Sequence, residues 1–178
     1  MRVEVEYRKG TFVMNEALQQ QVHQMAAWLT SDNARFGMLL CGKCGNGKTT
    51  LVRAFQSLLN VLNIRNEHRN TTWGIRIMEA RDITQLCKSN YQEWQRLCSV
   101  QMLAIDDLGT EPTEVLDFGN VLNPVVDLLT KRYNQQLFTI ITTNLTPAEI
   151  RDKYGDRIAD RFNEMMERIV FKNDTYRV

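Results

Sequence analysis

A glycine-rich segment near residue 45 has the residue types and the spacing that phosphate binding requires. The segment GKCGNGKT, from Gly42 to Thr49, has the fixed residues of the pattern G-x-x-x-x-G-K-S/T at every position. Glycine lets the backbone turn tightly and bring several N–H groups to phosphate oxygens, where a side chain would obstruct the approach. In this pattern Lys48 reaches the β- and γ-phosphates, and the hydroxyl of Thr49 binds Mg²⁺. The predicted cofactors are therefore ATP and Mg²⁺, and the predicted nucleotide contacts are Gly42, Lys43, Cys44, Gly45, Asn46, Gly47, Lys48, Thr49 and Thr50.

The sequence on either side of this loop predicts the elements that must hold it. Met38–Cys41 is a short apolar run typical of a buried strand, and apolar residues recur at helical spacing from Lys48 onward. A helix that begins at the loop points its positive N-terminal end at the bound phosphates. A chance glycine-rich turn would not need to leave a strand and enter an amphipathic helix. The context therefore favours a genuine phosphate-binding loop.

Two consecutive carboxylates follow a second apolar run, Val100–Ile105. Asp106, at the end of this predicted strand, can hold Mg²⁺ together with Thr49, usually through water. Asp107 can orient or deprotonate the attacking water. An acidic pair at a strand end is a weak motif alone, but it gains meaning downstream of an intact phosphate-binding loop. Aspartate is shorter than the glutamate more usual at this position in ATPases, so hydrolysis is expected to be slow.

Three polar residues further along the chain have two interpretations each. Asn144 ends the apolar run Leu137–Thr142, where it could sense the γ-phosphate or be an ordinary turn residue. Arg157 and Arg161 are spaced i, i+4 and share a helix face. They could form salt bridges on a solvated helix, or one could be an arginine finger that reaches a neighbouring subunit's nucleotide. The spacing does not separate these alternatives.

Composition excludes several classes of protein. The 178 residues fit one domain, and the net charge of +1 gives no overall attraction to nucleic acid or membrane. No apolar run approaches the roughly 20 residues of a membrane span, and the charged N-terminal segment does not resemble a signal peptide. The four cysteines are therefore interpreted as reduced thiols in the cytoplasm. Cys41 and Cys44 form a C-x-x-C pair, but a zinc site needs two further ligands, so no metal is assigned to cysteine.

Short apolar runs alternate with helical stretches, which predicts an α/β fold with a doubly wound, five-stranded, mostly parallel sheet. Helices are expected to begin at Lys48, at Pro124 and after the capping box at Thr146, and another is expected over about 156–167. A further helix is expected through Ile83 and to continue over Tyr91–Leu97. A further amphipathic helix, Gln19–Leu29, is expected to pack on the core. Residues 1–37 are expected to be an N-terminal extension, and residues 38–178 the ATPase domain. The predicted strands are Met38–Cys41, Gly74–Met78, Val100–Ile105, Leu137–Thr142 and Arg168–Phe171.

In their order and spacing, the segments GKCGNGKTT, IDDLG, LLTKRY, TIITTNL and YGDRIADRF resemble the AAA+ ATPases of the DnaC/DnaI helicase-loader and IstB-like transposition-helper family. The similarity runs from about Met38 to Arg177. It implies a P-loop ATPase domain of AAA+ type without a helical lid domain, with Asn144 as the sensor-1 residue. It also implies that Arg161 is the trans-acting finger, with Arg157 as second candidate. Asp160 stands where the family has serine before this arginine.

The same resemblance implies a role in DNA replication as a helicase loader, with a replicative helicase as partner. The alternatives are a transposition helper that delivers a transposase, and an ATP-dependent binding module with negligible turnover. Single-stranded DNA and a second copy of the chain, which would share the ATP site, are further expected partners. The 37 residues before Met38 are too few for a usual partner-binding domain, so a fragment and a reduced relative both stay open. Phe12 and Val13 are candidates for the adenine pocket. The scattered basic residues Arg65, Arg69, Arg76, Lys131 and Arg132 could contact DNA, but solvated surface is the preferred interpretation. Trp73 and Trp94 could stack on bases, but packing is the preferred interpretation.

Overall fold

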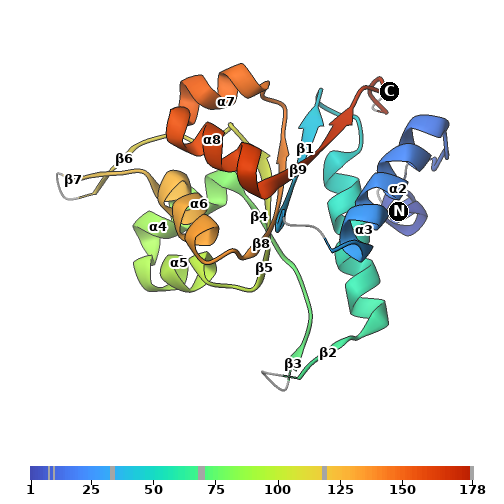
Figure 1. The fold of residues 1–178 in the computed structure, drawn as a ribbon, viewed down its shortest axis with the longest axis horizontal. Coiled ribbons are helices and arrows are strands. Elements are labelled where there is room, and N and C mark those ends of the chain that lie inside the picture. The colour runs from blue at the N-terminus through green and yellow to red at the C-terminus, as the bar shows by residue number, and fades with distance from the viewer. Residues whose placement is uncertain (8, 10, 33–34, 68–70, 118–119, 177–178) are drawn as a thin grey trace.

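A five-stranded sheet forms the centre of the molecule (Figure 1). The computed structural model describes residues 1–7, 9, 11–32, 35–67, 71–117 and 120–176. All neighbouring strands in the sheet are parallel, so the predicted α/β fold is confirmed. Each predicted strand is present, with bounds that differ by a few residues. In spatial order the strands are β4 (Arg76–Glu79), β5 (Met102–Leu108), β8 (Phe138–Thr143), β1 (Gly37–Gly42) and β9 (Met166–Phe171).

Helices cover both faces of the sheet, as Figure 1 shows. Successive strand residues point to opposite faces, so Leu39 packs in one apolar cluster while Met38 and Leu40 pack in the other. The first cluster includes residues of α4 (Ala80–Ser89), α5 (Tyr91–Cys98), α6 (Pro124–Asn134), α7 (Pro147–Tyr154) and α8 (Asp156–Met165). The second includes residues of α2 (Glu16–Thr30) and α3 (Lys48–Leu62). No helix among the residues that the structure describes is long and apolar enough to cross a membrane.

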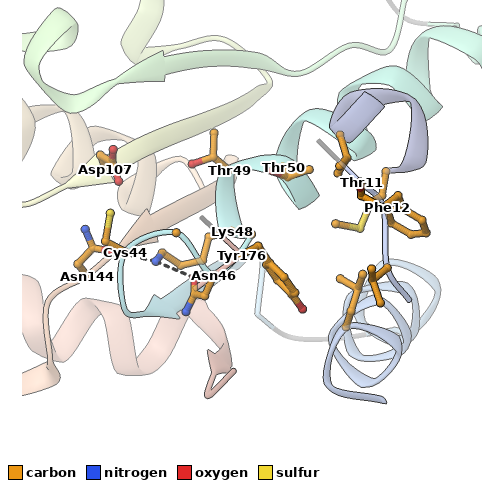
Figure 2. Close-up of a pocket in the computed structure, with 16 residues that line it drawn as sticks. Thr11, Phe12, Cys44, Asn46, Lys48, Thr49, Thr50, Asp107, Asn144 and Tyr176 are labelled. Carbon is orange, nitrogen blue, oxygen red and sulfur yellow. Dashed lines mark hydrogen bonds between the residues drawn. The ribbon is translucent and has the colours of Figure 1, made fainter. Parts of the chain in front are cut away.

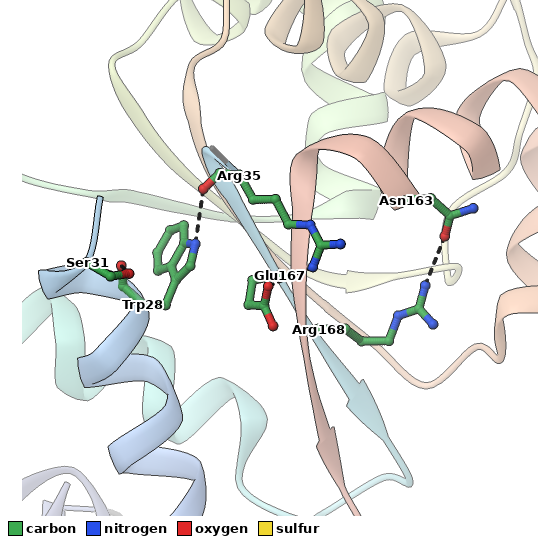
Figure 3. A network of polar contacts seen from close by, with 6 residues as sticks. All are labelled: Trp28, Ser31, Arg35, Asn163, Glu167 and Arg168. Carbon is green, nitrogen blue, oxygen red and sulfur yellow. Dashed lines mark hydrogen bonds and ion pairs between the residues drawn. The ribbon is translucent and has the colours of Figure 1, made fainter. Parts of the chain in front are cut away.

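Helix α2, which precedes the first strand of the sheet, packs on the sheet, as the amphipathic pattern predicts. Met25 and Trp28 are buried in the second cluster, and the rings of Trp28 and Phe138 have centroids 5.2 Å apart. The indole N–H of Trp28 also donates to the backbone carbonyl of Arg35, at 3.1 Å (Figure 3). The guanidinium of Arg35 in turn pairs with Glu167 of β9, at 2.7 Å. Both ion-pair side chains are more than a third exposed, so the buried apolar contacts contribute most of the stability here.

Several local elements differ from the sequence predictions. Tyr91–Leu97 does not continue the preceding helix, because Asn90 interrupts it and caps a new helix by accepting from the N–H of Glu93 at 3.0 Å. The capping box at Thr146 and Glu149 is confirmed. The elements that the sequence reading missed are α1 (Arg2–Tyr7) and two short antiparallel pairs. These pairs are β2 (Arg65–Asn66) with β3 (Thr71–Thr72), and β6 (Val115–Asp117) with β7 (Asn120–Leu122).

Arg132 is fully buried, which corrects its interpretation as a solvated surface residue. Its guanidinium donates to Thr139 Oγ1 at 2.8 Å and to the backbone carbonyls of Val100 and Phe138 at 2.8 and 2.6 Å. These carbonyls lie beside the starts of β5 and β8, where a buried acceptor without a donor is costly. Burial lowers the pKa of Arg132 to about 10, so the side chain remains charged at neutral pH. Trp94 is also buried and cannot stack on a base, and Arg69 lies outside the described residues.

Replacement of Arg132 by methionine is expected to lower the free energy of unfolding by about 3–5 kcal/mol. Methionine fills much of the same volume but donates to none of the carbonyls, so these acceptors stay buried without a donor. Urea unfolding followed by circular dichroism measures the change. Arg96→Met is the matched control, because the side chain of Arg96 is 76% exposed. Equal stability of the two variants would contradict the structural role of Arg132.

Candidate nucleotide-binding site

The predicted phosphate-binding loop joins β1 to α3, as the sequence requires. Gly42, Gly45 and Gly47 all have positive φ angles, of 150°, 78° and 98°. At Gly42 a β-carbon would also lie 2.4 Å from the carbonyl oxygen of Phe171, so no larger residue fits there. Asn46 fixes the loop from the side by donating to the same carbonyl of Phe171, at 3.1 Å. The loop is therefore bound to β9 as well as to its own strand and helix.

The ammonium group of Lys48 lies at the centre of the loop. It donates to the backbone carbonyls of Gly42 and Lys43 at 2.7 and 2.8 Å, and to Asn46 Oδ1 at 3.1 Å. It also donates to Asn144 Oδ1 at 2.8 Å, which joins the loop to the end of β8. Burial lowers the pKa of Lys48, and the nearby carboxylate of Asp107 opposes this effect. The structure thus brings together Lys48 and Asn144, which are far apart in the sequence.

Asp106 and Thr49, the two predicted Mg²⁺ ligands, are in direct contact. The hydroxyl of Thr49 donates to Asp106 Oδ1 at 2.9 Å, and Asp106 is 5% exposed. Thr142 of β8 donates to the same oxygen at 2.5 Å. A hydroxyl and a carboxylate are the hard oxygen ligands that Mg²⁺ prefers, so these residues fit the expected metal ion. Thr142 was not predicted as a site residue, although it is the last residue of a predicted strand and lies two positions before Asn144.

A bulge in β5 positions the second carboxylate. The register between β5 and β8 shifts between Ile105 and Leu108, and Asp107 has a left-handed φ of 52°. The N–H of Asp107 donates to Thr142 Oγ1 at 2.9 Å, which holds this conformation. In a regular strand two consecutive side chains point to opposite faces. A bulge can re-aim one of them, and here Asp107 lines the same cavity as Lys48.

A cavity of about 350 Å³ lies against the loop (Figure 2). One end is polar and the other is apolar, and the apolar end comes from the N-terminal segment and α2. Phe12 and Val13, the candidates for adenine contact, line this end. Tyr176 lies between the two ends in Figure 2, and its N–H donates to the carbonyl of Gly45 at 2.9 Å. The described lining consists of Met1, Val5, Thr11, Phe12, Val13, Leu18, Cys44, Gly45, Asn46, Gly47, Lys48, Thr49, Thr50, Asp107, Asn144 and Tyr176.

Met1, Val5 and Leu18 were not predicted as site residues, because no local pattern connects the N-terminal segment with the loop. Cys44 is exposed and lines the cavity, whereas Cys41 is half-buried with its thiol against the carbonyl of Ile169 at 3.8 Å. Burial raises the pKa of the Cys41 thiol. None of the four cysteines, all within the described part of the chain, forms a disulfide.

The two arginines of α8 lie in different environments. Arg161 is 9% exposed, donates to Thr130 Oγ1 at 2.5 Å, and lies 4.9 Å from the centre of the Tyr133 ring. Arg157 is exposed and has no hydrogen-bond or ion-pair partner among the described residues. Neither lines the described cavity of its own chain. The neighbouring acids Asp156 and Asp160 pair instead with Arg151 of α7, at 2.5 and 3.5 Å.

This parallel sheet, with a glycine-rich loop between its interior strand β1 and α3 and acidic residues on the strand β5, defines a P-loop nucleotide-binding protein of the AAA+ type. A family model described as IstB-like ATP binding protein matches residues 4–178, and the chain belongs to this family. The predicted resemblance is thereby confirmed. No curated protein sequence matches the chain.

Solved structures of replication proteins share the fold. The DnaC helicase loader superposes with a TM-score of 0.67 at 22% identity, over 90% of this chain and 93% of that one. DnaI gives a TM-score of 0.63 at 17% identity, over 91% of this chain and 88% of that one. The replication initiator DnaA bound to AMPPCP and single-stranded DNA gives 0.65 at 16% identity, over 92% of this chain and 49% of that one. At these identities the similarity concerns the fold.

Proposed function

We propose that this protein binds and hydrolyses ATP with Mg²⁺ and acts as a molecular switch in the loading of a replicative helicase. The observation that carries the proposal is the convergence of an ammonium, a hydroxyl, a carboxylate and an amide at the polar end of one cavity, from Lys48, Thr49, Asp107 and Asn144. The second carboxylate, Asp106, lies directly behind Thr49 and accepts from its hydroxyl.

Each group has a role that follows from its position. Lys48, now held by loop carbonyls, exchanges these acceptors for the β- and γ-phosphates. Thr49 and Asp106 would hold Mg²⁺, which would supply positive charge beside the phosphates. Asp107 accepts the proton of the attacking water, and Asn144 holds that water or contacts the γ-phosphate. The apolar end of the cavity, with Phe12 and Val13, receives the adenine ring.

An arginine from a neighbouring copy completes the site in this proposal. Arg157 reaches such a neighbour without rearrangement, because its side chain is exposed and has no partner in the described part of the chain. Arg161, the residue that the family resemblance implies, must first leave Thr130 and Tyr133. ATP binding then favours assembly of subunits side by side, and hydrolysis releases the partner.

The proposed partners are a replicative helicase and single-stranded DNA in the cytoplasm. The fold similarity to a helicase loader, and to an initiator solved with single-stranded DNA, supports this choice. The family description supports the alternative, a transposition helper that assembles on duplex DNA and delivers a transposase. Binding to matched single-stranded and duplex oligonucleotides at several salt concentrations separates the two, because a phosphate-bound complex weakens as salt rises.

Asp107→Asn tests the hydrolytic step. Asparagine has nearly the same shape but accepts no proton, so turnover is expected to fall about 100-fold while ATP affinity stays within about threefold. Phosphate release and titration with a fluorescent ATP analogue measure the two quantities. Asp82→Asn, an exposed substitution on α4, is the control. Wild-type turnover in Asp107→Asn would remove Asp107 from the mechanism, and negligible turnover in the unmutated chain would favour a pure binding module.

A further inference from the structure

The turn after the two carboxylates, Gly109–Glu111, is held by charged side chains at all three of its carbonyls. The ammonium of Lys153 donates to the carbonyls of Gly109 and Glu111, at 2.7 and 2.6 Å. Nε of Arg81 donates to the carbonyl of Thr110, at 2.9 Å. A surface turn normally leaves such acceptors to water. Here two helices, α4 and α7, supply cations to fix three consecutive peptide groups.

The side chain of Glu111 fixes the same turn from inside. It is 2% exposed, and its Oε2 accepts from the N–H of Gly109 at 2.9 Å. Its Oε1 accepts from the hydroxyl of Tyr154, a buried residue at the end of α7. Burial, together with this bond, raises the pKa of Tyr154, so the phenol stays a neutral donor. A buried carboxylate is costly unless it is hydrogen-bonded, so both contacts are needed for Glu111 to lie here.

The turn is directly connected to the proposed catalytic carboxylate. Thr110 donates to the carbonyl of Asp107 through its N–H at 3.3 Å and through its hydroxyl at 2.9 Å. Asp107 has a left-handed φ, which costs free energy in a residue other than glycine unless the surroundings hold it. Gly109 packs so closely that a β-carbon there would lie 2.7 Å from Leu145, the neighbour of Asn144.

The contacts that run from Asp107 through the turn and Glu111 end at Tyr154, which is close in sequence to the exposed Arg157. Tyr154 is the last residue of α7, and Gly155 alone separates it from α8, which begins at Asp156. Arg157 is the second residue of α8. The contacts therefore form a continuous path from the start of α8 through Tyr154, Glu111 and the turn to Asp107.

We infer that Glu111 and Tyr154 are positioning residues that fix Asp107 in the nucleotide cavity and tie it to the helix that carries Arg157. The inference rests on the proposed function and deepens it. When Arg157 engages a neighbouring subunit, the position of α8 is transmitted to the water-activating carboxylate of the same chain. Hydrolysis in one subunit thus depends on the contact that this subunit makes with the next.

The first test compares Glu111→Ala, Glu111→Gln and Tyr154→Phe with the matched control Glu114→Ala, an exposed residue of the same loop. Glu111→Ala is expected to lower kcat about 10- to 100-fold, because a small displacement of a catalytic group has such an effect. Glutamine can accept from Gly109 and donate to the oxygen of Tyr154, so Glu111→Gln restores most of the turnover. Tyr154→Phe keeps the packed ring and shows a smaller loss. ATP affinity is unchanged in all four variants.

The second readout is hydrogen–deuterium exchange, which does not depend on turnover. Glu111→Ala and Tyr154→Phe are expected to speed exchange in both 107–113 and 151–161, and to leave 42–50 unchanged. Three results would each overturn the inference. They are faster exchange in 107–113 alone, a wild-type kcat in Glu111→Ala, and an equal loss of ATP affinity and turnover in that variant. If the unmutated chain hydrolyses no ATP, the proposed function fails, and the exchange pattern still decides whether the two segments are coupled.

Discussion

Replacement of Lys48 by alanine is expected to weaken ATP binding about 100-fold or more, which corresponds to about 2.7 kcal/mol. The ammonium of Lys48 is buried at the centre of the loop, and it already contacts carbonyl oxygens there. Charged hydrogen bonds to phosphate oxygens are stronger than neutral ones, and alanine makes none. Titration with a fluorescent ATP analogue measures the affinity.

Lys43→Ala is the control for this substitution, because Lys43 lies in the same loop with an exposed side chain. It removes one positive charge near the cavity but none of the contacts of Lys48. The thermal midpoint of both variants without nucleotide shows whether the loop has lost its fold. Equal ATP affinity in Lys48→Ala, Lys43→Ala and the unmutated chain would show that the nucleotide phosphates bind elsewhere.

Replacement of Arg157 by alanine is expected to lower turnover about 1,000-fold with no change in ATP affinity. The arginine acts on the neighbour's transition state, so it contributes little to binding of ATP in its own chain. A mixture of Arg157→Ala with Lys48→Ala is expected to regain activity. In mixed pairs the intact nucleotide site of the first variant meets the intact arginine of the second. Phosphate release at increasing total protein concentration measures the recovery.

Arg161→Ala, tested in the same mixture, distinguishes the two candidate fingers. The structure predicts that Arg161→Ala lowers stability, because the arginine is packed against Tyr133 and bonded to Thr130. Suppose that Arg161→Ala loses turnover and regains it on mixing, and that Arg157→Ala shows neither effect. Arg161 is then the arginine finger. Full activity of both variants would mean that the site is complete within one chain.

Local chemistry explains why the central part of the site was predictable. The glycines, Lys48 and Thr49 all lie within the short segment Gly42–Thr49. The strand, the loop and the helix could therefore be predicted from neighbouring residues alone. Runs of apolar and β-branched residues predicted the interior strands β1, β5 and β8, because strands covered on both faces are buried along most of their length. Asn144 was placed by the same reasoning, since the carboxyl ends of parallel strands meet at one edge.

Contacts between distant segments explain what the sequence did not reveal. Arg132 looks like any basic residue of an exposed helix, and the carbonyls that it binds belong to segments that come together only in the fold. The bulge at Asp107 depends on Thr142 of another strand. Glu111 and Tyr154 are 43 positions apart, so no local pattern connects them.

Steady-state ATP hydrolysis of the unmutated chain, with and without single-stranded DNA, is the decisive measurement for the proposed switch ATPase. The measurement covers a range of protein concentrations and includes Lys48→Ala as the inactive reference. We expect Mg²⁺-dependent turnover that rises with protein concentration and with DNA, and no turnover in Lys48→Ala. Tight ATP binding with negligible turnover under every condition would show that the chain is a nucleotide-binding module and not a switch ATPase.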